Sequence, residues 1–216
     1  MLFSSSGFSH TGAAAETLLD TITTRADSRG LQTAERVGAV VFVTVLTAIA
    51  AQVSVPLPFT PVPFTFQPMV VLLGGAALGA RLGMTSQILY LALGIAGLPV
   101  FAASATLPPG AARLLGPTGG YLMSYPFAAF AAGYLAERGF DRRYVTAVVA
   151  MAAGLAVVFA CGVLWLGFVV QPSRGVSGAL AAGFVPFVIP DLFKLLVAAG
   201  VMPGLWWLTG RRDLRN

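Results

Sequence analysis

The sequence predicts an all-α membrane protein built as a bundle of six transmembrane helices, with an apolar, proline-rich lid loop between the first and second helices. Three observations predict this class. Hydrophobic residues make up 57% of the 216-residue chain, and charged residues only 10%, against about 25% in an ordinary soluble domain. The mean hydropathy is +0.84. This number of charged residues is too small to cover the surface of a soluble domain. The composition therefore excludes a soluble enzyme, and it also excludes a disordered chain and a disulfide scaffold.

Apolar runs long enough to cross a membrane follow one another along the chain. A hydrocarbon core of about 30 Å needs roughly 20 helical residues. The second run is short and follows a proline-rich stretch, the fifth is long enough to tilt, and the sixth contains three prolines. The six predicted spans are residues 37–53, 68–80, 83–101, 119–136, 144–170 and 184–208.

The two ends of the chain are polar and lie outside these spans. Residues 1–36 are rich in Ser, Thr, Ala and Gly, without an apolar run behind a basic start. They are therefore not a secretory signal and are predicted to be a mobile cytoplasmic extension. Within it, residues 13–22 could form a short amphipathic helix lying on the membrane. The six-helix membrane domain is expected at residues 37–208, and a basic cytoplasmic tail at residues 209–216.

Charge placement supports this count and sets the orientation. With six spans and a cytoplasmic N-terminus, the outer loops carry only Arg113 and Arg174. The cytoplasmic side then holds the other ten arginines: Arg25, Arg29, Arg36, Arg81, Arg138, Arg142, Arg143, Arg211, Arg212 and Arg215. Cytoplasmic loops carry such an excess of basic residues in multi-pass membrane proteins. The net charge of +5 is therefore interpreted as topology rather than nucleic-acid binding, with both termini in the cytoplasm.

The segment between the first two spans, residues 54–67, contains four prolines and no charge. Its prolines exclude a regular helix, and its apolar character argues against a freely solvated loop. Non-helical backbone at membrane depth must be sheltered by protein or water. We therefore expect a lid or re-entrant segment over the outer end of the bundle. A stiff, extended connector on the surface is the alternative.

The strongest candidate for a functional site is a pair of ionisable residues in the last span. Asp191 is the only acid in any predicted span, and Lys194 is the only lysine of the chain. Three residues apart, they share one face of a helix. A charge at membrane depth costs about 2.5–3.5 kcal/mol, so we expect both to face a ligand. The alternatives are a helix-dipole contact of Asp191 after Pro190, a snorkelling Lys194, and a mutual ion pair without ligand.

Sequence motifs of common enzymes are missing. The chain contains no GxxxxGK[ST] phosphate loop, no HExxH and no GxSxG, so it does not hydrolyse ATP through a phosphate loop and lacks these two hydrolase signatures. With one histidine, His10, and one cysteine, Cys161, neither a histidine-based metal site nor Cys–His catalysis is expected. No cofactor is predicted, and the protein is not expected to be an enzyme.

Four segments, in order and at compatible spacing, resemble one known family. They are PVPFTFQPMVVLLGGAALG (61–79), LYLALGIAGLPVFA (89–102), GPTGGYL (116–122) and PFVIPDLFK (186–194). Together they make roughly residues 37–208 similar to the BioY family. BioY proteins are the biotin-specific substrate-binding (S) components of energy-coupling factor (ECF) transporters.

The resemblance implies a six-helix bundle in the bacterial cytoplasmic (inner) membrane. Such a bundle binds biotin from outside for uptake, and its first long loop contributes to closing the site. Biotin would be a transported ligand and not a cofactor. The implied partners are the lipid bilayer, a transmembrane coupling protein and two ATPase subunits. The residues implied in substrate binding are Asp191, Lys194, Gln67, Thr65, Tyr90, Gly119 and Tyr121.

The implied ligand suits the residues chemically. A carboxylate can accept the two ureido N–H bonds of biotin, and an ammonium can donate to the ureido carbonyl. If Asp191 and Lys194 both hold the ureido group, the valerate carboxylate needs another partner, for which Arg113 or backbone amides near Gly119 and Gly120 are candidates. Three alternatives remain: an S component for riboflavin or thiamine, a membrane-embedded enzyme using Asp191 and Lys194 as acid and base, and a structural subunit whose pair is self-satisfied.

Overall fold

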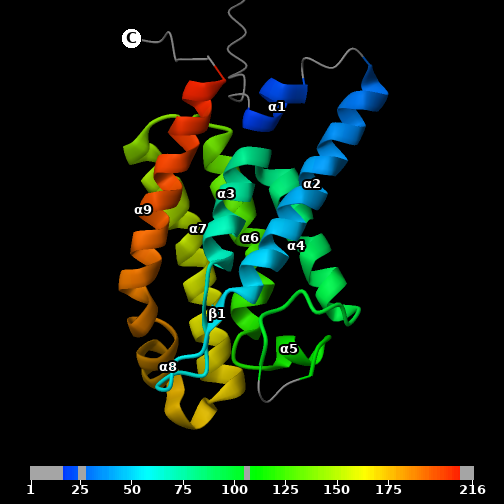
Figure 1. Cartoon of the computed structure of the whole chain (residues 1–216). Helices are drawn as coiled ribbons and strands as arrows, with labels where there is room; N and C mark the ends of the chain where they lie inside the picture. The colour runs from blue at the N-terminus through cyan, green and yellow to red at the C-terminus, as the bar shows by residue number, and fades with distance from the viewer. Residues whose placement is uncertain (1–16, 24–27, 105–107, 210–216) are drawn as a thin grey trace, which may run out of the picture.

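The computed structural model describes residues 17–23, 28–104 and 108–209, and most of them are helical (Figure 1). The helices are α1 (Leu18–Thr23), α2 (Arg29–Gln52), α3 (Gln67–Leu78), α4 (Ala80–Ile95), α5 (Ala112–Leu115), α6 (Gly119–Ala136), α7 (Tyr144–Trp165), α8 (Gly175–Gly183) and α9 (Val185–Leu208). A π-helical turn, Leu166–Val170, and a 3₁₀ turn, Pro172–Arg174, connect α7 to α8. Two short strands, β1 (Ser54–Val55) and β2 (Phe64–Thr65), form an antiparallel hairpin.

Helix α6 is the centre of the bundle and contacts α3, α4 and α7. Helix α2 covers α3 and α4 from one side, and α9 covers α3 and α7 from the other. At one end of the bundle lie α1 and the last turn of α9, which we call the α1 end (Figure 1). The β1–β2 hairpin, α5 and α8 lie at the opposite end, called the hairpin end. Most side chains of the main core come from α3, α6, α7 and α9.

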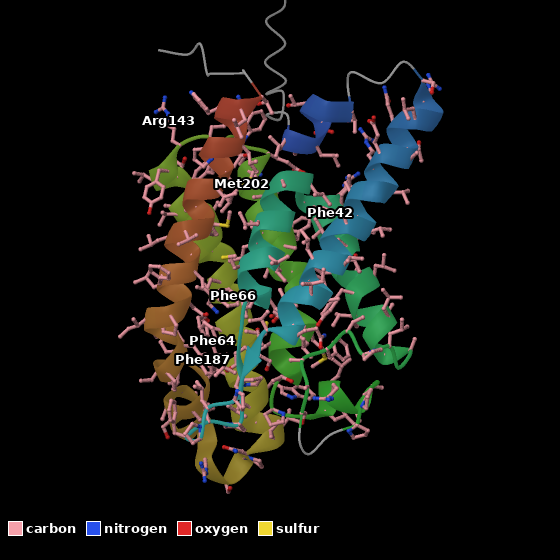
Figure 2. All side chains as sticks on the ribbon, in the orientation of Figure 1. Phe42, Phe64, Phe66, Arg143, Phe187 and Met202 are labelled. Carbon is pink, nitrogen blue, oxygen red and sulfur yellow. The ribbon has the colours of Figure 1, made fainter. Side chains whose placement is uncertain are left out.

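The outside of the bundle is apolar. Phe42 on α2 and Ile189 on α9 are 63% and 81% exposed, and Phe42 is labelled in Figure 2. Among the described residues, three helical stretches are long and apolar enough to cross a membrane: Arg29–Gln52, Tyr144–Val170 and Pro172–Leu208. Helix α3 is a shorter apolar helix. Large exposed apolar surfaces mark contact with a membrane or another protein, and the prediction of a mainly helical membrane protein is confirmed at this level.

The predicted fourth, fifth and sixth spans agree closely with the helices, whereas the first and third spans differ from them at their boundaries. Helix α6 has the predicted bounds, and α7 with its π-helical turn covers the predicted fifth span. Helix α2 begins at Arg29, ahead of the predicted residue 37, because Ser28 caps it by accepting a hydrogen bond from the Leu31 amide. Residues 29–36, expected to belong to the mobile extension, are therefore helical. Helix α4 ends at Ile95, before Gly97 takes a positive φ of 98°.

The short helix α1 packs against the bundle. Leu18 and Leu19 are buried, and α1 contacts α2 and α3. The helix expected over residues 13–22 was predicted to lie on the membrane; the described part instead places these two leucines against an apolar groove of the bundle. Asp20 forms an ion pair with Arg36 of α2 at 3.6 Å. The rest of the predicted extension, residues 1–16 and 24–27, and the tail from residue 210 lie outside the described residues.

Helices α3 and α4 are separated by a single glycine, which explains why the second predicted span is short. Gly79 has a φ of 84°, a left-handed conformation that favours glycine. The amide of Ala80, at the start of α4, donates to Glu137 Oε1 at 2.8 Å. Because Glu137 follows α6, this carboxylate satisfies one of the free amides at the start of α4 and fixes the break against the central helix.

Candidate ligand-binding site

Asp191 and Lys194 lie on the buried face of α9, as their spacing predicts. They are 6% and 5% exposed, and Lys194 Nζ forms an ion pair with Asp191 Oδ1. Within the part of the chain that the structure describes, Oδ1 of Asp191 has no hydrogen-bond partner besides this contact. A buried ion pair is stable only when further hydrogen bonds satisfy its remaining polar atoms. The pair therefore has hydrogen-bonding capacity to offer a ligand.

The hairpin covers the lysine. Lys194 Nζ donates to the Thr65 carbonyl oxygen at 2.7 Å and lies 4.1 Å from the centre of the Phe64 ring. The rings of Phe64 and Phe66 meet edge to face with their centroids 5.6 Å apart, and both residues are labelled in Figure 2. Ammonium groups are attracted to aromatic faces at such distances. Strand β2 thus contacts the ammonium group of the ion pair, although α9 is far away in sequence.

Gln67 and Tyr90 form a second polar group beside the pair. Gln67 Nε2 donates to the Tyr90 hydroxyl at 2.6 Å, and that hydroxyl donates to the Val100 carbonyl at 3.2 Å. Tyr90 is fully buried, and its ring packs edge to face on Phe101. Because the Tyr90 hydroxyl both accepts and donates a hydrogen bond, its position is fixed, and it in turn fixes the orientation of the Gln67 amide.

Tyr121 stands on α6 and is held by two glycines. Its hydroxyl donates to the Gly183 carbonyl at 2.7 Å. A Cβ atom added at Gly162 would lie 2.2 Å from the Tyr121 ring, and one at Gly183 would lie 2.3 Å from the Tyr121 hydroxyl oxygen. Real Cβ contacts are longer than this. A side chain at either glycine would therefore collide with Tyr121 in its present position. The side chain is thereby fixed between α7 and the end of α8.

Gly119 has a packing role in the structure. Its amide donates to the Gly116 carbonyl at 3.0 Å. A Cβ atom there would lie 1.8 Å from the Leu114 carbonyl oxygen and 3.0 Å from Trp165 Nε1. The missing side chain therefore lets α5 and α7 approach the start of α6 closely.

One cavity at the hairpin end joins most of the predicted site residues. Thr65, Gln67, Tyr121, Asp191 and Lys194 all line it, whereas Tyr90 and Gly119 are not among its lining residues. The lining residues that the sequence reasoning missed are Val62, Pro63, Pro68, Ala102, Thr118, Leu122, Tyr125, Val158, Phe159 and Phe187. Phe187 is labelled in Figure 2.

Helical spacing could have found several of the missed residues. Thr118, Tyr121, Leu122 and Tyr125 stand at positions i, i+3, i+4 and i+7. This spacing places them on one face of a helix. Phe187 precedes Asp191 by four positions on α9 and so lies on the face of the ion pair. The pattern is hard to notice because most of the neighbouring positions on both helices are apolar as well.

The chemistry of the cavity suits a small molecule with an apolar body and a flat polar head. Its walls are aromatic and aliphatic, with a few convergent polar groups, as in most small-molecule sites. A carboxylate acceptor next to an ammonium donor is complementary to adjacent N–H and C=O groups, as in a cyclic urea or an amide. Nothing in this arrangement requires a reaction on the ligand.

Arg113 of α5 lines a neighbouring cavity, which shares Pro63, Ala102 and Thr118 with this one. Its Nε donates to the Pro108 carbonyl and its Nη1 to the Ala102 carbonyl, both at 3.0 Å. Burial lowers the pKa of the Arg113 guanidinium, which nevertheless stays protonated as arginine does in proteins. The hairpin end therefore holds a buried arginine besides Lys194.

The fold and the cavity define a membrane-embedded helical bundle that binds a small molecule. The sequence model of the BioY family matches residues 22–211. The chain belongs to the BioY family.

Curated relatives and one solved structure agree with this assignment. The biotin transporter BioY of Thermotoga maritima is 42% identical over 156 residues, which cover 72% of this chain and 86% of that protein. The probable biotin transporter BioY of Pyrococcus horikoshii is 39% identical over 165 residues, covering 76% and 92%. The crystal structure of the S component for biotin from an ECF-type ABC transporter superposes with a TM-score of 0.72 at 26% identity, covering 83% of this chain and 94% of that one.

Proposed function

We propose that this protein is the biotin-binding S component of an ECF-type transporter, and that it binds biotin with high affinity for uptake across the bacterial cytoplasmic membrane. The observation that carries the proposal is the buried Asp191–Lys194 pair in an apolar-walled cavity. Relatives of this chain bear the name biotin transporter, and a chain of the same fold is an S component for biotin.

In the proposed complex, the ureido ring of biotin meets the ion pair. The Asp191 carboxylate accepts the ureido N–H groups, and the Lys194 ammonium donates to the ureido oxygen. The Gln67 side chain and the Thr65 backbone border the same space. Tyr121 and the other aromatic walls cover the fused rings, while Tyr90 acts by orienting Gln67. Gly119 would support the site through its close packing with α5.

The proposed topology has six spans, formed by α2, α3, α4, α6, α7 and α9, with residues 1–36 and 209–216 in the cytoplasm. In this arrangement the α1 end faces the cytoplasm and the hairpin end faces outward. Arg143 lies at the α1 end in Figure 2, together with α1 and its Arg36 contact. Arg113 and Arg174 belong to α5 and to the turn before α8, at the opposite end. This separation supports the positive-inside orientation.

Residues 54–67 form the proposed lid over the site. Two contacts support this role. Thr60 Oγ1 donates to the Ala182 carbonyl of α8 at 2.6 Å, and the Thr65 carbonyl accepts from Lys194. The segment is thus held at its tip and at its second strand, so that it covers the cavity from outside. Ligand entry requires both contacts to open.

The proposed partners supply the energy for uptake. The chain itself carries no phosphate-loop motif, so a transmembrane coupling protein and two ATPase subunits would drive release of biotin into the cytoplasm. The protein's own task is recognition, which is consistent with a cavity whose polar side chains can bind a ligand.

Calorimetric titration of biotin into the purified, ligand-stripped protein in detergent tests the proposal. We expect saturable binding at about one site per chain, with riboflavin and thiamine giving no heat. Binding of one of these vitamins in place of biotin would change the assigned ligand. A substrate mass change on incubation with pure protein would instead support the enzyme alternative.

Cysteine labelling from outside the cell tests the topology. In a Cys161→Ser background, Arg174→Cys is expected to react with a membrane-impermeant maleimide, and Arg81→Cys only after the membrane is opened. Both positions are exposed, so accessibility to the reagent depends on the side of the membrane. The reverse pattern would refute the proposed orientation.

A further inference from the structure

The loop between β1 and β2, residues 56–63, is apolar on both of its sides, and we call it the hairpin loop. On its inner side, Val62 is buried in the main core and Leu57 packs against that core. On its outer side, the Phe59 side chain is 66% exposed. Three exposed prolines accompany Phe59: Pro56, Pro58 and Pro61. Exposed apolar surfaces mark contact with a membrane or another protein, so the outer side of the loop needs an apolar neighbour.

The backbone of the hairpin loop has few donors left to satisfy. Four of its eight residues are prolines, which carry no N–H group. The Val62 amide donates to Thr60 Oγ1 at 3.1 Å, and the Thr60 amide donates to the Leu57 carbonyl at 3.4 Å. Among the described residues, only the amides of Leu57 and Phe59 in this loop have no acceptor. Non-helical backbone next to lipid must have its polar groups satisfied, and this loop comes close to that condition by itself.

The hairpin loop lies beside a stretch that can cross a membrane. Thr60 donates to the Ala182 carbonyl of α8, and Ala182 belongs to the apolar stretch Pro172–Leu208. Leu180 and Val185, which flank Ala182 in sequence, are both exposed. In Figure 1, the turn between α7 and α8 extends farther from the α1 end than the hairpin loop does. The exposed side of the loop therefore adjoins the apolar outside of the bundle and does not project beyond its end.

The side chains of the hairpin loop favour lipid over a protein partner. Protein interfaces have a polar rim, whereas residues 37–80 contain no charged side chain. Thr60 is the only residue of the loop with a polar side chain. Its hydroxyl already donates to Ala182 and accepts from the Val62 amide. The loop thus offers apolar surface to its neighbour and hardly any hydrogen bond, which is what acyl chains require.

We infer that the hairpin loop inserts Phe59 into the lipid of the outer leaflet, so that the lid is anchored in the membrane. The choice of leaflet rests on the proposed topology, whereas the insertion rests on the loop itself and is independent of the ligand. Apolar side chains at a membrane surface lie at the boundary between headgroups and acyl chains. Lipid is then a third contact of the lid, besides the Ala182 carbonyl and the Lys194 ammonium. Movement of the lid carries Phe59 through lipid.

Spin labelling in liposomes tests the insertion. In a Cys161→Ser background, Phe59→Cys is modified with a methanethiosulfonate nitroxide, and the full chain is reconstituted into phosphatidylcholine liposomes at high lipid excess. Electron paramagnetic resonance then compares relaxation of the label by oxygen, which concentrates in lipid, with relaxation by nickel ethylenediaminediacetate, which stays in water. We expect oxygen to be the stronger relaxant at residue 59. Ile189→Cys, exposed on α9, should show the same order, and Arg174→Cys, exposed in the turn before α8, should show the reverse.

Two other results at residue 59 would overturn the inference. Stronger relaxation by nickel would show a solvated loop, and weak relaxation by both reagents would show a loop covered by protein. Because the label replaces the phenylalanine itself, Val55→Cys on the exposed side of β1 is a second reporter that keeps Phe59. Adding Phe59→Asp to it should raise relaxation by nickel relative to oxygen, and an unchanged ratio would refute the role of Phe59. The measurement uses no biotin and needs no defined orientation, so its failure leaves the proposed function standing.

Discussion

Replacing Asp191 or Lys194 with alanine is expected to weaken biotin binding at least tenfold, which is about 1.4 kcal/mol. Each substitution removes a charge-assisted hydrogen bond to the ureido ring. It also leaves the other charge buried without its partner, which destabilises proteins by about 3–5 kcal/mol. Both singly substituted proteins should therefore unfold at lower temperature than the wild type. Titration calorimetry and a thermal unfolding curve measure the two effects.

The double variant Asp191→Ala/Lys194→Ala separates binding from stability. Without either charge, the desolvation cost disappears, and we expect stability to recover toward the wild-type value while binding stays weak. Phe193→Ala is the matched control on the same helix, since its side chain is 69% exposed and faces away from the cavity. Wild-type affinity in the folded double variant would show that the pair is structural and would refute the assigned site.

Gly75→Val is expected to prevent assembly of the bundle. A Cβ atom at Gly75 would lie 2.3 Å from the Ala129 carbonyl oxygen and 2.8 Å from the Ala129 Cα atom. These are backbone atoms of the central helix α6 and cannot move aside as a side chain can. Overpacking in a core costs about 1–3 kcal/mol and sometimes more, and this site lies where α3 and α6 touch. We expect loss of the monodisperse peak in size-exclusion chromatography, or a sharply lowered melting temperature.

Gly204→Ala is the control for that experiment. Nothing lies within 4 Å of a Cβ atom at Gly204, and alanine is the better helix former. This variant of α9 should melt at or above the wild-type temperature. Equal melting temperatures for Gly75→Val and Gly204→Ala would contradict the close approach of α3 and α6.

The bounds of α6, α7 and α9 could be predicted from the sequence, whereas the start of α2, the end of α4 and the presence of α8 could not. Helices α6 and α7 coincide with apolar runs bounded by polar residues, which is the signal that hydropathy detects. Helix α2 extends beyond such a run, because Ser28 starts it in a polar stretch where capping decides the boundary. Helix α8 was missed, since its small and apolar residues show the composition of an apolar connector as well as that of a helix.

For the site, the sequence indicated the residues that are chemically unusual and missed those that are not. Asp191 and Lys194 are conspicuous because charge is rare in apolar spans. Tyr125 and Phe187 form walls of the cavity but resemble the rest of an apolar chain. A glycine motif is ambiguous in another way: close approach to a ligand and close approach to backbone both require glycine. At Gly119 the structure shows approach to the Leu114 carbonyl.

Lys194 donates to the Thr65 carbonyl of the hairpin and, in the proposed complex, also to biotin. The same ammonium group therefore takes part in ligand binding and in the opening of the hairpin. If biotin competes for the protons that Lys194 donates to the hairpin, occupancy and hairpin position become thermodynamically linked, and each must shift the other by the same factor. A bound ligand that leaves the Thr65 bond intact would slow its own escape. A partner that pulls the hairpin away from α9 would lower the affinity for the ligand without contacting the cavity. A contact at the outer surface of the hairpin would thus trigger release of the ligand.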